Sequence, residues 1–301
     1  MTPIRRILVP TDFSDTATAA LRAAVAIARR ANATIVLLYA DRFDPPAEFT
    51  ASQVGAMAEE IEQERARAVA ELTRYAEEVI PFDLAREIVV VRDLPVPAIV
   101  CRADADADLV VMGTHGRTGI GRLLLGSVAE RVIHSIRKPV LTIRPATRPT
   151  IDWSIRRILV AVNSTEAARA ALEQAVEIAT LFDAGLTVLH VVEPKTDHEI
   201  RTIYGWIADL DERTLARVST LVEHGHAAQE VIAMARISEV DLIVVGAEPR
   251  VLRDVTTLGP TSTSLTASAS CPVLTVMRQR KDVEVCAGVT PSPITSPLRR
   301  R

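Results

Sequence analysis

The chain repeats itself, and this repeat constrains its fold more than any other feature. The segment Ile4–Val9 reads IRRILV, and the same six residues recur at Ile155–Val160, 151 positions later. Further along, Asp108–Gly113 (DLVVMG) aligns with Asp241–Gly246 (DLIVVG) at a spacing of 133. Ordered matches at two constant spacings indicate a duplicated domain whose second copy is 18 residues shorter in its middle.

Length and composition agree with two folded domains. The chain has 301 residues, and one domain takes about 150. Hydrophobic residues make up 48% and aromatic residues only 3%, so the cores must consist of Ala, Val, Ile and Leu. The last residues contain several prolines and show no periodicity, which is typical of disorder. We therefore predict domains at 1–146 and 151–279 and a disordered tail at 280–301.

Charge and cysteine content exclude several classes of protein. A formal net charge of −3 provides no broad positive field for a nucleic acid. The three cysteines are widely spaced, which indicates neither a disulfide framework nor a zinc site. The chain shows no secretory signal, and no stretch approaches the roughly 20 apolar residues that span a bilayer. We predict a cytoplasmic protein with no nucleic-acid or membrane partner.

Each copy alternates short aliphatic runs with helical stretches, which is typical of βαβ units and a parallel sheet. The expected strands of the first copy are Ile7–Val9, Ile35–Tyr39, Ile88–Val91, Leu109–Met112 and Val140–Ile143. The predicted fold class is α/β: two tandem copies of a doubly wound, Rossmann-like domain with five parallel strands. The final strand is expected to pair with the other copy or with a second chain.

Helix signals separate these strands. The first helix is expected to begin near Ser14 or Asp15, since either residue is a good N-cap. The second helix of the first copy is expected over about Ser52–Val79. The third is expected to begin near Pro97 and end in the acidic run Asp104–Asp108, and the fourth to begin after Gly126 and end before Pro139. The counterpart of the second helix is predicted over about His198–Val222, before Gly225.

The loop after the fourth strand carries the most distinctive chemistry. Between Met112 and Glu130 it holds five of the chain's 12 glycines, namely Gly113, Gly116, Gly119, Gly121 and Gly126. Glycine lets backbone approach a ligand closely, and the N-terminus of the following helix offers free N–H groups. The pattern predicts a phosphate cradle, with the Ser127 hydroxyl and Arg117 as donors. A plain connecting loop is the alternative, although it would need fewer glycines.

Two better-known phosphate motifs are absent. The segment Gly121–Ser127 has the GxxxxG spacing of a Walker A loop, but Ser127 stands where the essential Lys belongs. The turn Pro10–Ser14 contains no glycine, so the dinucleotide fingerprint after the first strand is missing too.

The spacing Gly113-x2-Gly116-x9-Gly126-Ser127, together with the first-strand segment ILVPTDFS, resembles the universal stress protein family. The resemblance covers both copies, from Ile4 to Arg144 and from Ile155 to Arg278. It implies a fold like that of the adenine nucleotide alpha hydrolases, with an adenine nucleotide at the strand ends in the ATP-binding branch. It also makes a homodimer plausible.

The resemblance assigns roles to residues of the first copy. Asp12 would face the ribose, and Ala40 would meet adenine through its backbone. The glycines of the motif and Ser127 would hold the phosphates, with Met112 beneath the loop. The expected nucleotide-binding set is Pro10, Thr11, Asp12, Ala40, Met112, Gly113, Thr114, His115, Gly116, Arg117, Gly119, Gly126, Ser127 and Val128. A simple turn or helix cap is the alternative role for Asp12.

The second copy departs from the motif. Asp12 corresponds to Asn163, Gly116 to Pro249, and Gly126-Ser127 to Gly259-Pro260; only Gly246 and Gly259 remain of the glycines. Proline has no N–H and fixes its own φ, so phosphate donors are lost. This second site is predicted to be degenerate, to bind nucleotide weakly or not at all, and to serve as a packing partner for the first copy.

No catalytic or metal-binding residue is predicted. His115 has no evident second residue to orient it as a base, and the remaining histidines lack metal-ligand spacing. Cys101 is interpreted as a core residue. The leading interpretation is a stress-response protein that binds ATP, with or without Mg²⁺, or ADP or AMP in its place. A slow nucleotide hydrolase or activating enzyme and a module with an empty pocket are the alternatives.

Overall fold

The computed structural model describes residues 3–40, 58–115, 125–145, 152–193, 199–248, 250–252, 255–257 and 259–277. The predicted tail lies outside these residues. The strands of the first copy are β1 (Arg6–Thr11), β2 (Thr34–Ala40), β3 (Arg86–Val91), β4 (Leu109–Gly113) and β5 (Val140–Ile143). Its described helices are α1 (Asp15–Ala31), α3 (Ala58–Val79), α4 (Pro95–Asp106) and α5 (Ser127–Ser135). All five expected strands are confirmed, and each of the expected helices is found, while the expected start of the second helix at Ser52 lies outside the described residues.

Local sequence explains where α1 begins and what it buries. Ser14 is the N-cap, and its hydroxyl accepts a hydrogen bond from the N–H of Ala17. The helix is rich in alanine, and Ala20, Ala23 and Ala24 are fully buried against the sheet. Small side chains let the helix approach the aliphatic strands closely, which accounts for a core with so few aromatic residues.

The second copy repeats this plan with added pieces. Its strands in the main sheet are β6 (Arg157–Val162), β7 (Gly185–Val192), β8 (Val218–His224), β9 (Leu242–Ala247) and β12 (Val273–Met277). Its helices are α6 (Glu166–Phe182), α7 (Glu199–Ala208), α8 (Glu212–Leu215), α9 (Ala227–Ile237) and α10 (Pro260–Ser268). A small antiparallel hairpin, β10 (Arg250–Leu252) with β11 (Val255–Thr257), precedes α10.

The helix predicted over His198–Val222 is wrong in its second half. The structure has α7, the single turn α8 and then strand β8. This strand pairs in parallel with β7, from Leu186 opposite Val218 to Val192 opposite His224. The connection between α8 and β8 is two residues long and contains no glycine or proline, so the sequence gives no sign of the change. No residue of β8 is fully buried, and Ser219 and His224 are exposed, which fits its place at the edge of the sheet.

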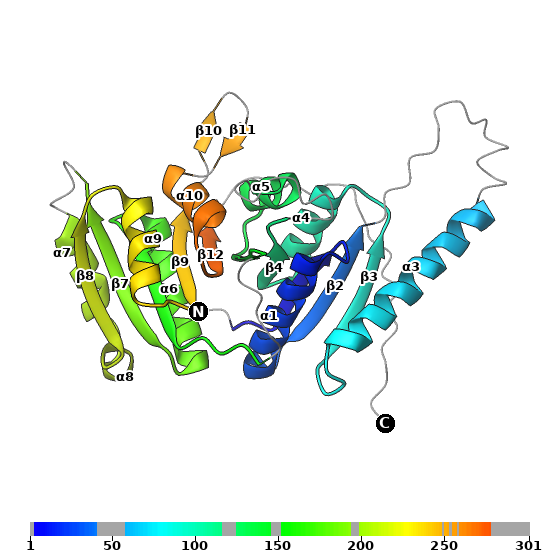
Figure 1. Cartoon of the computed structure of the whole chain (residues 1–301), viewed down its shortest axis with the longest axis horizontal. Coiled ribbons are helices and arrows are strands. Elements are labelled where there is room, and N and C mark those ends of the chain that lie inside the picture. The colour runs from blue at the N-terminus through cyan, green and yellow to red at the C-terminus, as the bar shows by residue number, and fades with distance from the viewer. Residues whose placement is uncertain are drawn as a thin grey trace.

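The two copies share one continuous sheet of ten strands, in the order β3-β2-β1-β4-β5-β12-β9-β6-β7-β8 (Figure 1). All neighbours are parallel except β5 and β12, which pair antiparallel with Leu141 opposite Leu274. The hydroxyl of Thr142 donates to the carbonyl of Val273 at 3.0 Å across this junction. The expectation that the final strand pairs with the other copy is therefore confirmed.

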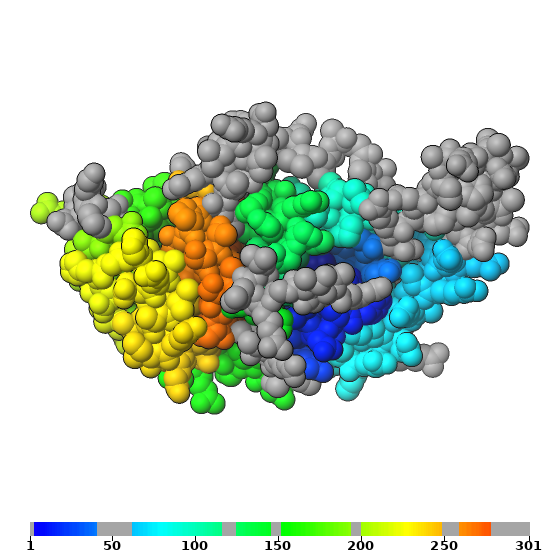
Figure 2. Space-filling model, turned by 45° about the horizontal axis from the view of Figure 1, so that its top comes forward, coloured from blue at the N-terminus to red at the C-terminus, as the bar shows by residue number. Residues whose placement is uncertain are grey.

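Side chains reinforce the junction. Met277 and Ala247 of the second copy pack in the same hydrophobic cluster as Val132 and Ile133 of α5. The Arg144 guanidinium donates to the carbonyl of Ala269 at 2.8 Å. In the space-filling view, the green surface of α5 lies beside the orange surface of α10 and β12 (Figure 2). The second copy thus packs directly against helix α5.

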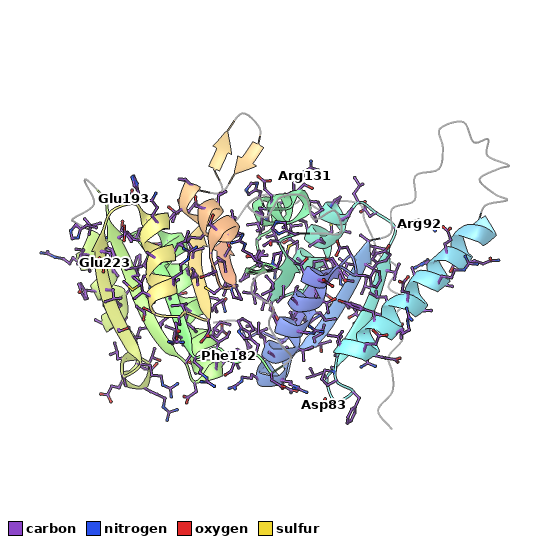
Figure 3. The ribbon with its side chains drawn as sticks, viewed as in Figure 1. Asp83, Arg92, Arg131, Phe182, Glu193 and Glu223 are labelled. Carbon is purple, nitrogen blue, oxygen red and sulfur yellow. The ribbon has the colours of Figure 1, made fainter. Side chains whose placement is uncertain are left out.

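The strands of the two copies run antiparallel where β5 meets β12, but the twist of the sheet brings the carboxyl ends of β3 and β7 to the same rim. Arg92 and Glu193 directly follow β3 and β7, and both lie at the upper rim in Figure 3. Asp83 and Phe182 precede the same strands and lie at the lower rim. Ligand sites of open parallel sheets lie at the carboxyl ends of strands, so the upper rim is where sites are expected.

Candidate functional site

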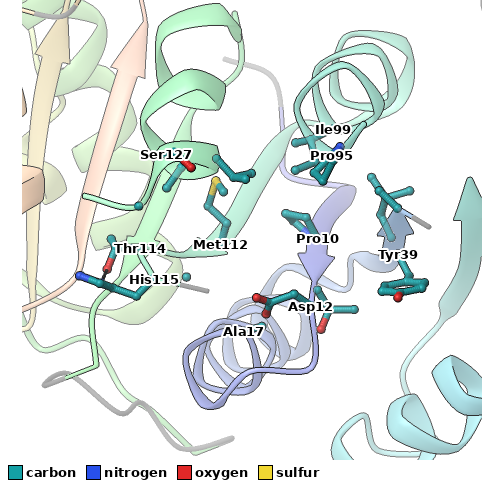
Figure 4. Close-up of a pocket in the computed structure, with 17 residues that line it drawn as sticks. Pro10, Asp12, Ala17, Tyr39, Pro95, Ile99, Met112, Thr114, His115 and Ser127 are labelled. Atoms are coloured by element: carbon teal, nitrogen blue, oxygen red, sulfur yellow. Dashed lines mark hydrogen bonds between the residues drawn. The ribbon is translucent and has the colours of Figure 1, made fainter. Parts of the chain in front are cut away.

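A cavity of about 410 Å³ opens at the carboxyl ends of β1 and β4 (Figure 4). The chain leaves β1 toward β2 on one side and later places β4 on the other, so the strand order reverses between them. Crevices at such switch points are the usual ligand sites of doubly wound folds. The fold itself therefore creates the cavity.

The cavity gathers the predicted residues that the structure describes. These are Pro10, Thr11, Asp12, Ala40, Met112, Gly113, Thr114, His115, Gly126, Ser127 and Val128. Gly116, Arg117 and Gly119 lie outside the described residues. The remaining lining residues were not predicted from the sequence; they are Ala17, Leu38, Tyr39, Pro95, Ile99 and Ala129. Tyr39 directly precedes Ala40 on β2, which was the one available signal for it.

Asp12 lies in a tight turn between β1 and α1. Its Oδ1 accepts a hydrogen bond from the N–H of Ser14 at 3.1 Å, and the Thr11 hydroxyl accepts from the N–H of Phe13 at 3.0 Å. The turn role considered for Asp12 is therefore correct. The same residue also lines the cavity, so the turn places a carboxylate at the cavity wall.

The N-terminus of α5 forms another part of the wall. Gly126 is its N-cap and provides no side chain to accept from the first N–H groups. The Gly126 N–H donates to the carbonyl of Thr114 at 2.7 Å, and a Cβ at Gly126 would stand only 2.6 Å from that oxygen. Glycine is thus required for this close approach. The positive end of α5, with Ser127 as its first residue, is directed to the cavity.

His115 has a partner that the sequence did not reveal. Its Nδ1 lies 2.9 Å from the Thr114 hydroxyl, and its carbonyl accepts a hydrogen bond from the Thr16 hydroxyl. Thr114 is buried, and its N–H donates to the carbonyl of Ile143. These bonds fix the strand end and orient the imidazole. A hydroxyl holds the ring in place but does not stabilise an imidazolium as a carboxylate would.

The second copy retains a cavity of about 320 Å³ at the equivalent strand ends. Of the predicted degenerate residues, Asn163, Gly246, Gly259 and Pro260 line it, and Pro249 lies outside the described residues. Pro260 occupies the first turn of α10, where Ser127 begins α5. The second cavity therefore lacks the N–H and the hydroxyl that the first has at this position.

Acidic residues replace other groups of the first cavity. Glu248 stands where the first copy has His115, and Glu193 lines the same space. The Glu193 carboxylate accepts from the N–H of Ala227 at the start of α9, so it covers that helix end. Two carboxylates on one cavity oppose an incoming polyphosphate. The loss of phosphate affinity in the second copy stays a prediction.

The other titratable groups serve the scaffold. Asp108 accepts from the backbone N–H groups of Arg5 and Arg6, and Asp106 pairs with the Arg6 guanidinium at 2.8 Å. Burial raises the pKa of the Cys271 thiol to about 12. Cys101 on α4 is only partly buried, which corrects its interpretation as a core residue, and it is disulfide-bonded, which the wide spacing of the cysteines did not indicate. Within the described ranges there is no His, Cys, Asp and Glu cluster suited to a metal, nor any helix long and apolar enough to cross a membrane.

Comparison with known proteins identifies the family. Two universal stress proteins of Methanocaldococcus jannaschii are 35% and 32% identical to this chain over 145 and 154 residues. Each match spans 46% of this chain, and 82% and 94% of the respective relative. The crystal structure of a universal stress protein from Archaeoglobus fulgidus shares the fold with a TM-score of 0.66 and 20% identity, covering 91% of this chain and 98% of its own. The sequence profile of the universal stress protein family matches twice, at residues 3–144 and 154–277. The chain therefore belongs to the universal stress protein family, as a tandem member with two domains.

Proposed function

We propose that the first domain binds an adenine nucleotide, with ATP as the leading candidate, and that the protein acts in the stress response as a nucleotide-dependent regulator or protective interaction protein. One observation carries the proposal. A single cavity brings together the Asp12 carboxylate and the N-terminus of α5, which has no capping side chain. The first group suits a ribose and the second a phosphate, so one nucleotide can satisfy both.

The rest of the cavity suits a nucleotide as well. Apolar surface comes from Leu38 and Ala40 near the end of β2 and from Ile99 in the first half of α4, and a flat base can lie against it. A volume of about 410 Å³ falls within the range of roughly 300 to 1,000 Å³ that small-molecule sites occupy. Figure 4 shows Asp12 and Ser127 on separate walls, with Met112 and Pro10 between them.

We further propose that the protein does not turn ATP over at an enzymatic rate. Fast phosphoryl transfer needs a group that orients the attacking water and cations that stabilise the transferring phosphate. The described wall offers His115, held by a threonine hydroxyl, and Asp12, held by the turn. Neither arrangement resembles an acid and base pair, and slow hydrolysis is the most that these groups support.

The test is a binding and turnover measurement on the full chain. Purified protein is incubated with ATP, with and without Mg²⁺, and bound nucleotide and released phosphate are both quantified. We expect about one ATP per chain and a rate far below the roughly 10 s⁻¹ that is typical of enzymes. Absence of bound nucleotide overturns the binding proposal, and turnover near the enzymatic rate overturns the regulatory one. Competition with ADP and AMP then ranks the nucleotides.

A matched pair of variants locates the site. Ser127→Pro gives the first copy the residue of the second, which removes an N–H and a hydroxyl from the cavity wall. We expect it to abolish the bound nucleotide. The reverse exchange, Pro260→Ser, leaves the acidic lining of the second cavity in place and is expected to change stoichiometry little. Loss of binding with Pro260→Ser and retention with Ser127→Pro would place the nucleotide in the second copy and contradict the proposed site.

A further inference from the structure

We infer that Phe13, clamped between Tyr39 and Tyr75, is a positioning residue that sets the Asp12 carboxylate and thereby makes the first domain distinguish ATP from 2′-deoxy-ATP. This inference rests on the proposed function, because it assumes that Asp12 faces the ribose. It goes beyond that function because it explains how the turn between β1 and α1 holds the carboxylate in one place.

The backbone at Phe13 is unusual. Its φ is 63°, in the left-handed region that non-glycine residues rarely occupy. Such a conformation persists only when surrounding structure holds it. The residue directly follows Asp12, so the φ of Phe13 determines how the chain leaves the Asp12 carboxylate and enters α1. Something must therefore fix the Phe13 side chain.

Two tyrosines fix it. The Phe13 ring lies 5.0 Å from the Tyr39 ring at 51° and 5.3 Å from the Tyr75 ring at 73°. Both distances and angles are typical of favourable aromatic contacts. The chain has only ten aromatic residues of the Phe, Tyr and Trp types, and three of them meet at this turn. We call Phe13, Tyr39 and Tyr75 the aromatic clamp.

The clamp is anchored to the start of α1. The Thr18 hydroxyl donates to the carbonyl of Ser14 at 3.1 Å and lies 2.9 Å from the Tyr75 hydroxyl, which therefore donates to it. Burial raises the pKa of Tyr75, so the phenol stays protonated and keeps this donor. Tyr75 belongs to α3 and Tyr39 to β2, so three separate elements hold the turn.

The second copy provides an internal comparison. Ser164 stands at the position of Phe13 and His190 at that of Tyr39, and Ser164 is not in the left-handed region. The Asn163 amide oxygen accepts from both the N–H and the hydroxyl of Thr165, at 3.2 and 2.7 Å. The clamp is thus absent from the copy whose turn carries no carboxylate. This pairing links the clamp to Asp12 rather than to the fold in general, which both copies share.

The experiment measures the affinity of the full chain for ATP and for 2′-deoxy-ATP. A ribose hydroxyl bound to a carboxylate is expected to favour ATP about tenfold or more in the native protein. Phe13→Ser, which introduces the residue of the second copy, is expected to reduce this preference to about twofold or less. Its affinity for 2′-deoxy-ATP should change little. Thermal unfolding of each variant shows whether it remains folded.

Controls separate positioning from general damage. Phe82→Ser removes a ring that is 97% exposed and takes part in neither contact of the aromatic clamp, and it should leave the ratio unchanged. Tyr75→Phe keeps the ring but loses the bond to Thr18, and it should lower the ratio less than Phe13→Ser. A purely structural role would weaken both nucleotides equally.

The outcomes are distinguishable. If native protein prefers ATP, Asp12→Ala abolishes the preference and Phe13→Ser keeps it, the positioning role is wrong while the proposed function stands. If native protein binds neither nucleotide, or if Asp12→Ala keeps the preference, the ribose contact itself is wrong. If the folded Phe13→Ser protein shows a smaller preference for ATP over 2′-deoxy-ATP than the native protein, the positioning role of Phe13 is supported.

Discussion

The two cavities of this molecule are built from equivalent elements, but of their two pairs of equivalent glycines only one is required for the same reason in both copies. Gly113 and Gly246 end β4 and β9, and a Cβ at either would strike the first turn of the adjacent helix. At Gly113 the nearest atoms belong to Thr16 at 3.0 Å, and at Gly246 the Ala167 carbonyl oxygen would be 2.3 Å away. Close packing alone requires these glycines. Their survival in the second copy therefore says nothing about phosphate.

The second pair of equivalent glycines, Gly126 and Gly259, differs because close contact requires a glycine at only one of the two positions. Gly126 faces the Thr114 carbonyl, whereas a Cβ at Gly259 would meet nothing within 4 Å. The motif thus mixes positions that packing demands with positions that the loop needs. A glycine motif read from sequence has to be separated into these parts before it indicates a ligand.

The largest expected effect tests the packing role. Gly246→Ala should lower the free energy of unfolding by about 3 kcal/mol, because its Cβ overlaps backbone that cannot move aside cheaply. Gly259→Ala, the matched control, should stay within about 0.5 kcal/mol. Chemical denaturation measures both. Equal effects for the two variants would contradict the packing explanation.

The next effect tests the carboxylate. Asp12→Asn introduces the residue of the second copy and should weaken ATP binding by about 1.5 to 3 kcal/mol, because charged hydrogen bonds to the ribose become neutral ones. Asn163→Asp should not create a second site, since the phosphate donors there are still missing. Calorimetric titration gives both affinities, and two bound ATP per chain in Asn163→Asp would refute this view of the second cavity.

A smaller effect separates Gly126 from its counterpart. Gly126→Ala should destabilise the protein by about 1 to 2 kcal/mol, because the Thr114 carbonyl must shift to admit a Cβ. The shift disturbs the N-terminus of α5, so ATP binding should fall as well. Unfolding and titration on the same sample check this, with Gly259→Ala again as the control. Unchanged binding despite lost stability would show that α5 is not in contact with the nucleotide.

The smallest effect is a pH dependence of the free energy of unfolding that comes from His134 of the first copy. Burial lowers the pKa of His134 on α5, and the equivalent residue of the second copy is Ala267. The unfolded state then binds a proton more readily than the folded one, so this contribution to stability is complete above about pH 6.5 and declines as the pH falls below that. His134→Ala should therefore lose less stability than the native chain between about pH 7.5 and pH 5.5. An identical loss in both proteins would remove His134 from the explanation.

Much of the scaffold could be predicted from the sequence, because aliphatic strands and capped, alanine-rich helices follow from local periodicity. The duplication, the five strands of the first copy and the Ser14 cap are examples. Strand β8 was not predicted, since only two residues, neither of them glycine or proline, separate it from the helical turn α8. The hairpin β10–β11, whose strands have three residues each, was not predicted either.

The candidate site divides in the same way. Loop residues such as Asp12 and Ser127 could be predicted because they follow strand ends, where a parallel sheet places its ligands. Pro95 and Ile99 could not, because they reach the cavity only through the packing of α4 against the sheet. The partnership of Phe13 with Tyr75 was equally hidden, as 62 positions separate the two residues in the sequence.

The antiparallel pairing of β5 with β12 also has a consequence for the cell. Because the partner strand is part of the same polypeptide, its local concentration stays at roughly millimolar levels however dilute the protein becomes. The edge of β5 is then already taken when a related single-domain protein arrives. The two halves are made in equal amounts and cannot be exchanged for other subunits, so the half whose cavity holds Asp12 remains permanently joined to the half whose cavity carries a different lining.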